Sequence, residues 1–572
     1  MSAVRRGVVA VLVALGVLVA AAVPASAHAV LLRTEPSPQS TVPRAPGSVR
    51  LEFSEPVETA FGAVRVYDVD GHRVDRGKVA RAPGQGVVEV PVGSLKDGTY
   101  TVTWRVVSAD GHQVHGGFVF YVGAPSTISP VAIAGDAGAG RTIGWGFGVV
   151  RFVWFSALIA LIGLAVARRM VWTPALRAAG LADSPVADGF RTRFGRTLPL
   201  AWLVLVIAGA VGIVFQAASA SGLSLQDAAS PTVIGDVLAT TYGRAWSAQM
   251  VLAVLAVLPV LALSRTRPLL PGRPARWLGV LGVLVIGLSV TAAVSGHART
   301  DPHPVLAEAS IAVHLLSVGC WVGGLAALVL LGGLGWRTVP PERRSGLVRE
   351  LVPRFSRVAM VAVVVVIASG TLNAITAMAG VSDLWRTEYG KVVSAKVVLL
   401  VLALVLAARH LRVTPRHLAG DDDVRAVRSF ARTSALELVL LAVAVALASA
   451  LVALVPGRSL ALAEKGAVSV ERGIGADTVQ LFIDPTAVGA NQVHVTFVNP
   501  SGLAAAEVTN VTVAVTPPVG SARAVAMRLI APGHFAGDTT FSRPGKYRLS
   551  VSTTVAGKRV STTFTFTISR RA

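Results

Sequence analysis

The sequence predicts a mixed multidomain protein: an exported immunoglobulin-like β-sandwich, an eight-helix transmembrane bundle, and a second exported β-sandwich at the C-terminus. Three observations predict this fold class. An apolar start follows Arg5 and Arg6, as in secretory signals. Eight later apolar runs each approach the ~20 residues that a helix needs to cross the hydrocarbon core. On either side of those runs, apolar and polar residues alternate as they do in strands.

The composition agrees with a membrane protein. Of the 572 residues, 53% are hydrophobic and only 15% are charged, which is outside the range of soluble chains. The net charge of +22 comes mostly from arginines in short loops between apolar runs, so it predicts membrane orientation and no nucleic-acid partner. Cys320 is the only cysteine of the sequence, so no internal disulfide can form.

Residues 1–27 are predicted to be a signal peptide that ends in the small-x-small pattern Ala25-Ser26-Ala27. Cleavage after Ala27 would make His28 the first residue of the mature chain. Such a histidine offers a metal both its α-amine and its imidazole. Two nitrogens in a fixed bite suit tetragonal Cu(II).

Residues 28–123 are predicted to form the first β domain. Segments 49–53 and 100–106 alternate apolar and polar side chains, and Asp70-Gly71 and Asp97-Gly98 mark turns. About a hundred residues of this kind predict an antiparallel sandwich. Residues 124–142 are expected to be a linker.

Residues 143–456 are predicted to be the membrane domain. The loops expected in the cytoplasm, 168–196, 265–276, 336–357 and 409–432, hold 6, 4, 6 and 6 arginines, whereas the three opposite loops hold 0, 1 and 2 basic residues. This bias agrees with export of the first domain. The spans are expected at about 143–167, 197–219, 244–264, 276–296, 306–335, 357–379, 391–408 and 433–456.

The membrane domain also resembles a tandem duplication of a four-helix unit. Arg-Phe-Gly-Arg at 193–196 resembles Arg-Phe-Ser-Arg at 354–357, and Tyr-Gly-Arg at 242–244 resembles Tyr-Gly-Lys at 389–391. Repeats of this kind occur in transport proteins. The alignment places Trp154 where the second unit has His314.

Residues 457–572 become polar and strand-like again. Segments 492–498 and 547–551 alternate, and Pro544-Gly545-Lys546 marks a turn. His494 and His534 are far apart in sequence and show no ligand spacing. We therefore expect an extracytoplasmic immunoglobulin-like domain without a metal.

The first domain contains a second candidate for metal binding, Asp110-Gly111-His112. In an extended segment, residues two apart point the same way, so Asp110 and His112 can reach one ion. With His28 they form a set of three nitrogens and one oxygen, which favours Cu(II). Residues 28–123 contain no Met and no Cys, the sulfur ligands that Cu(I) prefers.

These residues carry a family resemblance. His28, the segment LEFSE at 51–55 and the segment WRVVSADGH at 104–112 resemble CopC, a small periplasmic copper-binding protein of bacterial copper resistance. The membrane part resembles CopD, its inner-membrane partner, so the whole chain resembles a CopC/CopD fusion. The resemblance implies His28, Asp110 and His112 as Cu(II) ligands, and Glu55 as a residue near the metal. The methionine-rich Cu(I) site of some members is missing here.

Three residues of the membrane domain are further candidate copper ligands. His297 lies in the loop before the fifth span, and His314 and Cys320 lie within that span. Ionisable groups at such depth are costly and usually functional. We therefore predict a path for copper, as Cu(I) in the membrane domain, from the exported site through His297, His314 and Cys320.

The leading hypothesis is a non-enzymatic protein of copper transport, homeostasis and resistance, which captures Cu(II) outside and delivers it to or across the inner membrane. Its expected partners are the copper ion, the lipid bilayer and other copper-handling proteins. A copper redox enzyme that uses an amino-terminal histidine brace is one alternative. A b-type cytochrome with haem between His297 and His314 is another.

Overall fold

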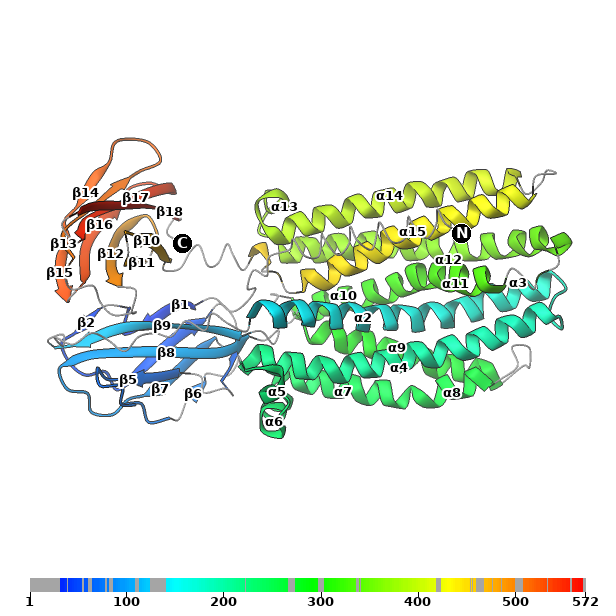
Figure 1. Cartoon of the computed structure of the whole chain (residues 1–572), viewed down its shortest axis with the longest axis horizontal. Helices are drawn as coiled ribbons and strands as arrows, with labels where there is room; N and C mark the ends of the chain where they lie inside the picture. Colours follow the sequence, from blue (N-terminus) through cyan, green and yellow to red (C-terminus); the bar gives the residue numbers. More distant parts are fainter. Residues whose placement is uncertain are drawn as a thin grey trace. The chain divides into compact units, whose positions relative to one another are not determined.

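The computed structural model contains two β regions and a helical bundle (Figure 1). The bundle is a compact unit separate from the β regions. The structure describes residues 31–568 except 39, 54–55, 60–63, 78–79, 82–85, 109–112, 124–139, 222, 266–272, 297–302, 336–338, 340, 418–422, 453, 455, 459–467, 476, 485, 499–507, 532 and 556–557.

The first β domain is a sandwich, as the sequence predicts. One sheet has the order β1-β3-β7-β6 and the other β2-β9-β8-β4, with β5 also paired to β8. Because successive side chains of a strand point to opposite faces, Val49 and Leu51 of β3 enter the core, where they meet Val102 and Phe120 of the other sheet. The strands are β1 (Leu31–Glu35), β2 (Thr41–Val42), β3 (Ser48–Phe53), β4 (Val57–Glu58), β5 (Val64–Tyr67), β6 (Ala80–Arg81), β7 (Val87–Pro91), β8 (Gly98–Ser108) and β9 (Gln113–Val122).

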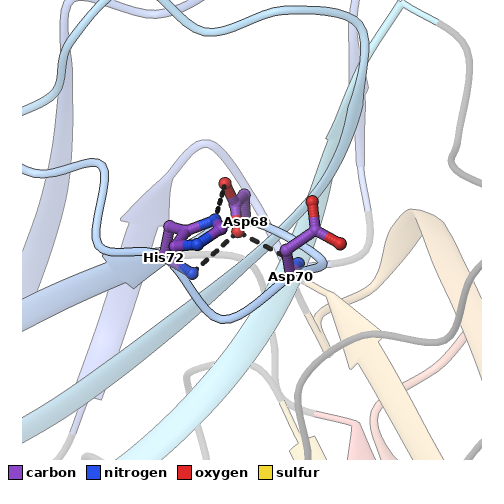
Figure 2. A group of neighbouring side chains, drawn as sticks. All are labelled: Asp68, Asp70 and His72. Atoms are coloured by element: carbon purple, nitrogen blue, oxygen red, sulfur yellow. Dashed lines mark hydrogen bonds and ion pairs between the residues drawn. The ribbon is translucent and has the colours of Figure 1, made fainter.

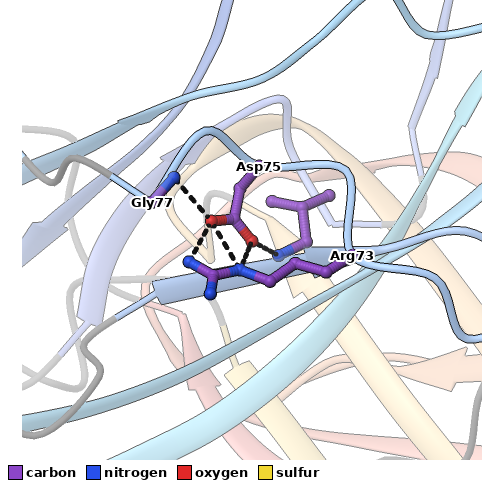
Figure 3. Close-up of polar contacts among 4 residues, drawn as sticks. Arg73, Asp75 and Gly77 are labelled. Carbon is purple, nitrogen blue, oxygen red and sulfur yellow. Dashed lines mark hydrogen bonds and ion pairs between the residues drawn. The ribbon is translucent and has the colours of Figure 1, made fainter.

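The chain after β5 is held by the carboxylate of Asp75 (Figure 3). Arg73 donates to it from Nε at 2.9 Å and from Nη2 at 2.6 Å, and the backbone N–H groups of Val66 and Gly77 donate at 3.0 Å. Burial alone would raise the pKa of Asp75, but the hydrogen bonds outweigh it and hold the pKa below its ordinary value. The carboxylate therefore fixes this segment to the sheet in its ionised form.

Eight helices of the bundle are long and apolar enough to cross a membrane, as the sequence predicts. Neighbouring helices run roughly antiparallel (Figure 1), so the first span begins and the last span ends at the same end of the bundle, here called the proximal end. The opposite end is called the distal end. The helices are α2 (Gly140–Val166), η1 (Ala167–Trp172), α3 (Thr173–Ala178), α4 (Pro185–Ser221), α5 (Leu225–Ala228), α6 (Pro231–Ala239), α7 (Thr241–Leu255), α8 (Val257–Arg265), α9 (Arg273–Val294), α10 (Pro304–Val318), η3 (Gly319–Gly323), α11 (Gly324–Gly335), α12 (Pro341–Ala377), α13 (Asp383–Arg386), α14 (Glu388–His417) and α15 (Asp423–Leu451).

Several segments expected to be loops are helical. The arginine-rich stretch 168–196 continues the first span through the π-helical turn η1 into α3, and then begins α4 at Pro185. In α4 the polar first turns bury Phe190 and Phe194 in the core of the bundle. These helices are therefore longer than the apolar runs that predicted them, because the polar residues at their ends are helical too.

The contacts of the bundle agree with the predicted duplication. A Cβ atom at Gly209 would lie 3.7 Å from Nε1 of Trp154, and one at Gly370 would lie 3.2 Å from Cε1 of His314. The two glycines therefore face the two residues that the sequence alignment equates. In the same way, Thr240 accepts a hydrogen bond from the N–H of Gly243 at 3.1 Å, and Thr387 accepts one from Gly390 at 2.9 Å.

The two four-helix units meet at a pair of glycines. A Cβ atom at Gly163 of α2 would collide with the backbone of Gly323 in η3, and one at Gly323 would collide with the carbonyl oxygen of Ile159. Gly163 and Gly323 have the same spacing in sequence as Trp154 and His314, so they are equivalent positions. Equivalent residues that contact each other are the mark of a two-fold relation.

The C-terminal β domain is also a sandwich, as predicted. Its sheets have the orders β10-β11-β12-β16-β15 and β14-β13-β17-β18, and their inner faces share one core. The strands are β10 (Val468–Ile474), β11 (Asp477–Asp484), β12 (Gly489–Val498), β13 (Thr509–Thr516), β14 (Arg523–Val525), β15 (Arg528–Ala531), β16 (His534–Phe541), β17 (Gly545–Val555) and β18 (Lys558–Ile568).

Candidate functional site

The predicted ligands of the first β domain, His28, Glu55, Asp110 and His112, lie outside the described residues. The strands that flank them are described. β1 begins at Leu31, three residues after His28, and β8 ends at Ser108, two residues before Asp110.

The flanking strand ends are paired with one another. Leu31 is the cross-strand partner of Phe53, which precedes the segment that contains Glu55. After that segment, Val57 of β4 is the partner of Ser108. Each pairing thus joins the described ends of two segments that are far apart in sequence, with one pairing in each sheet.

A group of three potential metal ligands does occur among the described residues of this domain (Figure 2). One ligand atom from each of Asp68, Asp70 and His72 lies within 4.8 Å of the others. Oδ1 of Asp68, however, accepts hydrogen bonds from the backbone N–H groups of Asp70 at 3.0 Å and His72 at 2.8 Å. The group therefore forms a polar turn before the strand-like segment that Asp75 anchors, and the side chain of His72 is 79% exposed.

In the bundle, His314 lies ten residues into α10, about 15 Å from its start at the proximal end. Its Nδ1 lies 3.0 Å from Oγ of Ser369 on α12. Ser369 donates its only hydroxyl proton to the carbonyl of Val365 at 2.5 Å, so its Oγ accepts a hydrogen from Nδ1. This assigns the proton to Nδ1 and leaves Nε2 as the nitrogen that can bind a metal.

Two further contacts fix the surroundings of His314. Ser310, one turn earlier on α10, donates to the carbonyl oxygen of Ser369 at 3.3 Å. Lys396 of α14 is close enough to interact electrostatically with His314. Its equivalent in the first unit, by the sequence alignment, is Gln249, which is neutral. The second unit thus combines an imidazole, a hydroxyl and an ammonium from three helices.

Cys320 lies about two turns deeper than His314, in the π-helical turn η3, and is partly buried. Next to it, Trp321 donates a side-chain hydrogen bond to Glu437 of α15. The sequence reasoning missed Glu437, although an acidic residue inside the eighth apolar run was a usable signal. His297 lies outside the described residues, so its relation to His314 stays a prediction.

In the C-terminal domain, His494 is a core residue. It is 2% exposed, its Nε2 lies 3.0 Å from Oε1 of Gln492, and its ring packs edge-on against Phe482. Burial lowers the pKa of His494 to about 4. The residue is therefore neutral at pH 7.

Three family models match the chain. Residues 31–123 match the CopC domain, residues 142–302 match the copper resistance protein D-like N-terminal domain, and residues 349–451 match copper resistance protein D. The matches cover the first β domain and most of the helical bundle.

Individual relatives agree with these matches. The chain is 30% identical over 391 residues to the copper transport protein CutJ of Bacillus subtilis. The aligned residues cover 68% of each of the two chains. It is 26% identical to the inner membrane protein YebZ of Escherichia coli, over 54% of this chain and 97% of that one. The crystal structure of CopC from Methylosinus trichosporium OB3b aligns with 17% of this chain and 95% of its own, at 31% identity and a TM-score of 0.16.

Proposed function

Because this chain belongs to the CopC/CopD family of copper resistance proteins, and so is a copper-handling multi-pass inner-membrane protein, we propose that it captures Cu(II) outside the cytoplasm and delivers copper to or across the membrane. In this proposal the protein catalyses no chemical reaction on a substrate. The mature chain begins at His28, both of its β domains are extracytoplasmic, and residues 124–142 and the segment after 456 connect them to the bundle.

The observation that supports the capture site best is the pairing of Leu31 with Phe53 and of Val57 with Ser108. The first pairing joins the strand that follows His28 to the strand that precedes Glu55, and the second joins the strand that follows Glu55 to the strand that precedes Asp110 and His112. The α-amine and imidazole of His28, the imidazole of His112 and the carboxylate of Asp110 would bind Cu(II), with Glu55 next to the ion. Nitrogen and oxygen ligands of this kind favour Cu(II) over softer Cu(I).

Within the bundle, we propose that copper binds as Cu(I) to Nε2 of His314, after an external one-electron donor has reduced the captured Cu(II). The hydrogen bond between Nδ1 and Ser369 supports this assignment, because metal-binding histidines commonly hold the other ring nitrogen in such a bond. His297 would receive the ion before His314, and Cys320 would receive it afterwards. Other copper-handling proteins would supply or accept the ion.

The capture site is tested by moving the chain end. The mature full-length protein, with His28 first, is compared in lipid nanodiscs with a version that carries one extra glycine before His28. The extra residue converts the α-amine into a peptide nitrogen, so we expect Cu(II) affinity to fall at least about tenfold. The Cu(II) spin resonance spectrum should also change, because a nitrogen ligand is lost.

The matched control is His72→Ala, which removes an exposed histidine of the same domain that serves a turn. It should bind Cu(II) as the unaltered protein does. Equal affinity and equal spectra for the native and extended chain ends would show that the α-amine is not a ligand. Loss of binding in His72→Ala alone would move the site to the Asp68 turn.

A further inference from the structure

Glu437 is a carboxylate buried inside the membrane-spanning part of the bundle. It lies five residues after Arg432, where the eighth span begins at the distal end, which places it about 8 Å into the span. The residue is 3% exposed, and the indole of Trp321 donates to its carboxylate. Glu437 is therefore a polar group in the buried interior of the membrane-spanning bundle.

A second buried polar atom lies on the same helix face. Ser434 precedes Glu437 by three residues, is 2% exposed, and its Oγ has no hydrogen-bond partner among the described residues. Residues three apart in a helix are neighbours on its surface. Leaving a buried hydroxyl without a partner costs about 1–3 kcal/mol. A hydroxyl here can exchange hydrogen bonds with a carboxyl group or with an entering water.

The tryptophan that contacts Glu437 belongs to an unusual turn. Trp321 lies in η3, the π-helical turn at which the two four-helix units meet, and it follows Cys320 directly. Single π-helical turns within α-helices occur frequently at functional sites. Glu437 is thus connected to the helix that carries the proposed copper residues, about two turns deeper than His314.

The first four-helix unit has no equivalent carboxylate. The fourth span, residues 273–294, contains no Asp or Glu, and neither do the first and third spans. Glu437 lies instead in the unit that also holds His314 and Lys396. Because the two units share one helical plan, the acidic group is not needed to build that plan.

The elements packed against α15 contribute few titratable residues near Glu437. α2 has none between Phe152 and Val166, and α11 has none. η3 contributes Cys320. α12 contributes Arg354, which pairs with Glu350, and Arg357, which is exposed. α14 contributes Lys396 towards the proximal end, and Arg409 and His410 towards the distal end.

Moving a carboxylate from water into a low-dielectric interior costs several kcal/mol, so neutralising its charge there is favourable. A proton can neutralise it when the bundle is empty, and a metal cation can do so when the bundle is loaded. We propose that Glu437 is a proton-binding site that exchanges one proton for each Cu(I) ion that passes through the bundle. The carboxyl O–H bond breaks as Cu(I) enters from the proximal end, the proton leaves to water at that end, and the carboxylate takes up a proton from water at the distal end when Cu(I) has left there.

This inference rests on the proposed function for the cation, but its central claim can be tested without copper. Infrared spectra of the full chain in nanodiscs should contain the carbonyl band of a buried protonated carboxylic acid. The band should shift in D₂O and should disappear in Glu437→Gln. Glu388→Gln, which removes an exposed glutamate paired with Lys391 at 2.6 Å, should leave the band in place.

Two further variants guard against a folding defect. Glu437→Asp keeps a titratable group and should keep a band at an altered frequency. Ser434→Ala removes a hydroxyl that has no partner among the described residues, so it should keep the band. If no band depends on Glu437 between about pH 5 and pH 8, the carboxylate is permanently ionised and the inference is wrong.

The coupling is tested in proteoliposomes loaded under reducing conditions that keep copper as Cu(I). One-for-one exchange is electroneutral, so a pH difference of about one unit should support an about tenfold Cu(I) concentration ratio across the membrane. Glu437→Gln should reduce that ratio to about one, whereas Glu388→Gln should preserve it.

Two other results of these copper and infrared measurements would overturn the exchange. Copper that moves with no dependence on the pH difference would overturn the exchange and leave the proposed copper delivery standing. If the unaltered protein moves no copper while the Glu437 band titrates normally, copper passage through the bundle is wrong and the exchange fails with it. The buried proton site would then serve another process.

Discussion

The two four-helix units of the bundle share a backbone plan but differ in their chemistry. Gly209 faces Trp154 in the first unit, and Gly370 faces His314 in the second. Gln249 and Lys396 are also equivalent, and Glu437 has no acidic counterpart. The duplicated scaffold therefore keeps its geometry in both copies, while the second copy carries the imidazole, ammonium and carboxylate groups.

The units also differ in how well two of their four spans are covered. In the first unit, 33% of the apolar window of Pro185–Ser221 and 28% of that of Thr241–Arg265 are buried, against 17% for Gly346–Ala377 and 6% for Glu388–Ala408 in the second. The second unit thus exposes more of its surface along the two helices that bear Ser369 and Lys396.

The largest effect is expected from His314→Gln, which removes the proposed ligand nitrogen. Copper movement in proteoliposomes should fall to the level of protein-free vesicles, because losing even a partner of a metal ligand costs about 10- to 100-fold in affinity. The equivalent substitution in the first unit, Trp154→Phe, should leave copper movement nearly unchanged. Equal losses in both variants would mean that the units do not differ in function.

The second-largest effect tests whether the two units contact each other through the equivalent glycines Gly163 and Gly323. Gly163→Val would force a side chain into the backbone of Gly323, and we expect a loss of about 3 kcal/mol or more in the free energy of unfolding. Gly282→Ala on α9, where no described atom lies within 4 Å of the added methyl, should be neutral or stabilising by up to about 1 kcal/mol. Thermal unfolding midpoints in nanodiscs measure both. If Gly163→Val had the same unfolding midpoint as the unaltered protein, the close contact between Gly163 and Gly323 would be contradicted.

The two β domains offer a parallel comparison, since the first is proposed to present histidines to a metal and the second buries His494. Burial lowers the pKa of His494 to about 4, against about 6.5 in an unfolded chain. Between these values the unfolded state binds a proton that the folded state does not, so stability falls as the pH falls. From pH 7 to about pH 4 the loss should reach about 3 kcal/mol.

Hydrogen exchange of β12, corrected for its intrinsic pH dependence, measures that loss. His494→Leu should flatten the pH dependence in this domain because it removes the titrating group. A slope that survives the substitution would assign the acid sensitivity to other residues.

A smaller effect is expected from Ser369→Ala, which deletes the acceptor for Nδ1 of His314. The imidazole would keep its place but lose its fixed tautomer, so copper affinity of the bundle should fall about tenfold. The alignment equates Ser369 with Ala208 of the first unit, so Ala208→Ser is the matched control and should change little. An unaltered affinity in Ser369→Ala would remove the serine from the site.

The fold was largely predictable from sequence because it depends on local patterns. Apolar runs of membrane length indicated all eight spans, and alternation indicated both sandwiches. The helix ends were less predictable: α4 begins at Pro185, within an arginine-rich stretch whose phenylalanines find buried partners only in the folded bundle. Hydropathy identifies the apolar stretch of a helix that faces lipid. It does not identify the helix ends that extend beyond that stretch.

The candidate site was predictable only in part. His314 is conspicuous because it interrupts an apolar run, but its partner Ser369 is 55 residues away and no local pattern joins them. Glu437 escaped detection because one acidic residue barely lowers the mean hydropathy of its span, and its contact with Trp321 exists only in the tertiary structure. His28, Glu55, Asp110, His112 and His297 stay predictions.

The contact between Gly163 and Gly323 has a consequence for how the two four-helix units arose. At that point each unit offers its neighbour the same small residue from the same helix, as identical subunits do across a symmetry axis. A free four-helix protein with one such glycine could therefore have bound a second copy of itself before the genes were joined. Fusion then let one partner specialise, since the other could go on supplying the shared contact.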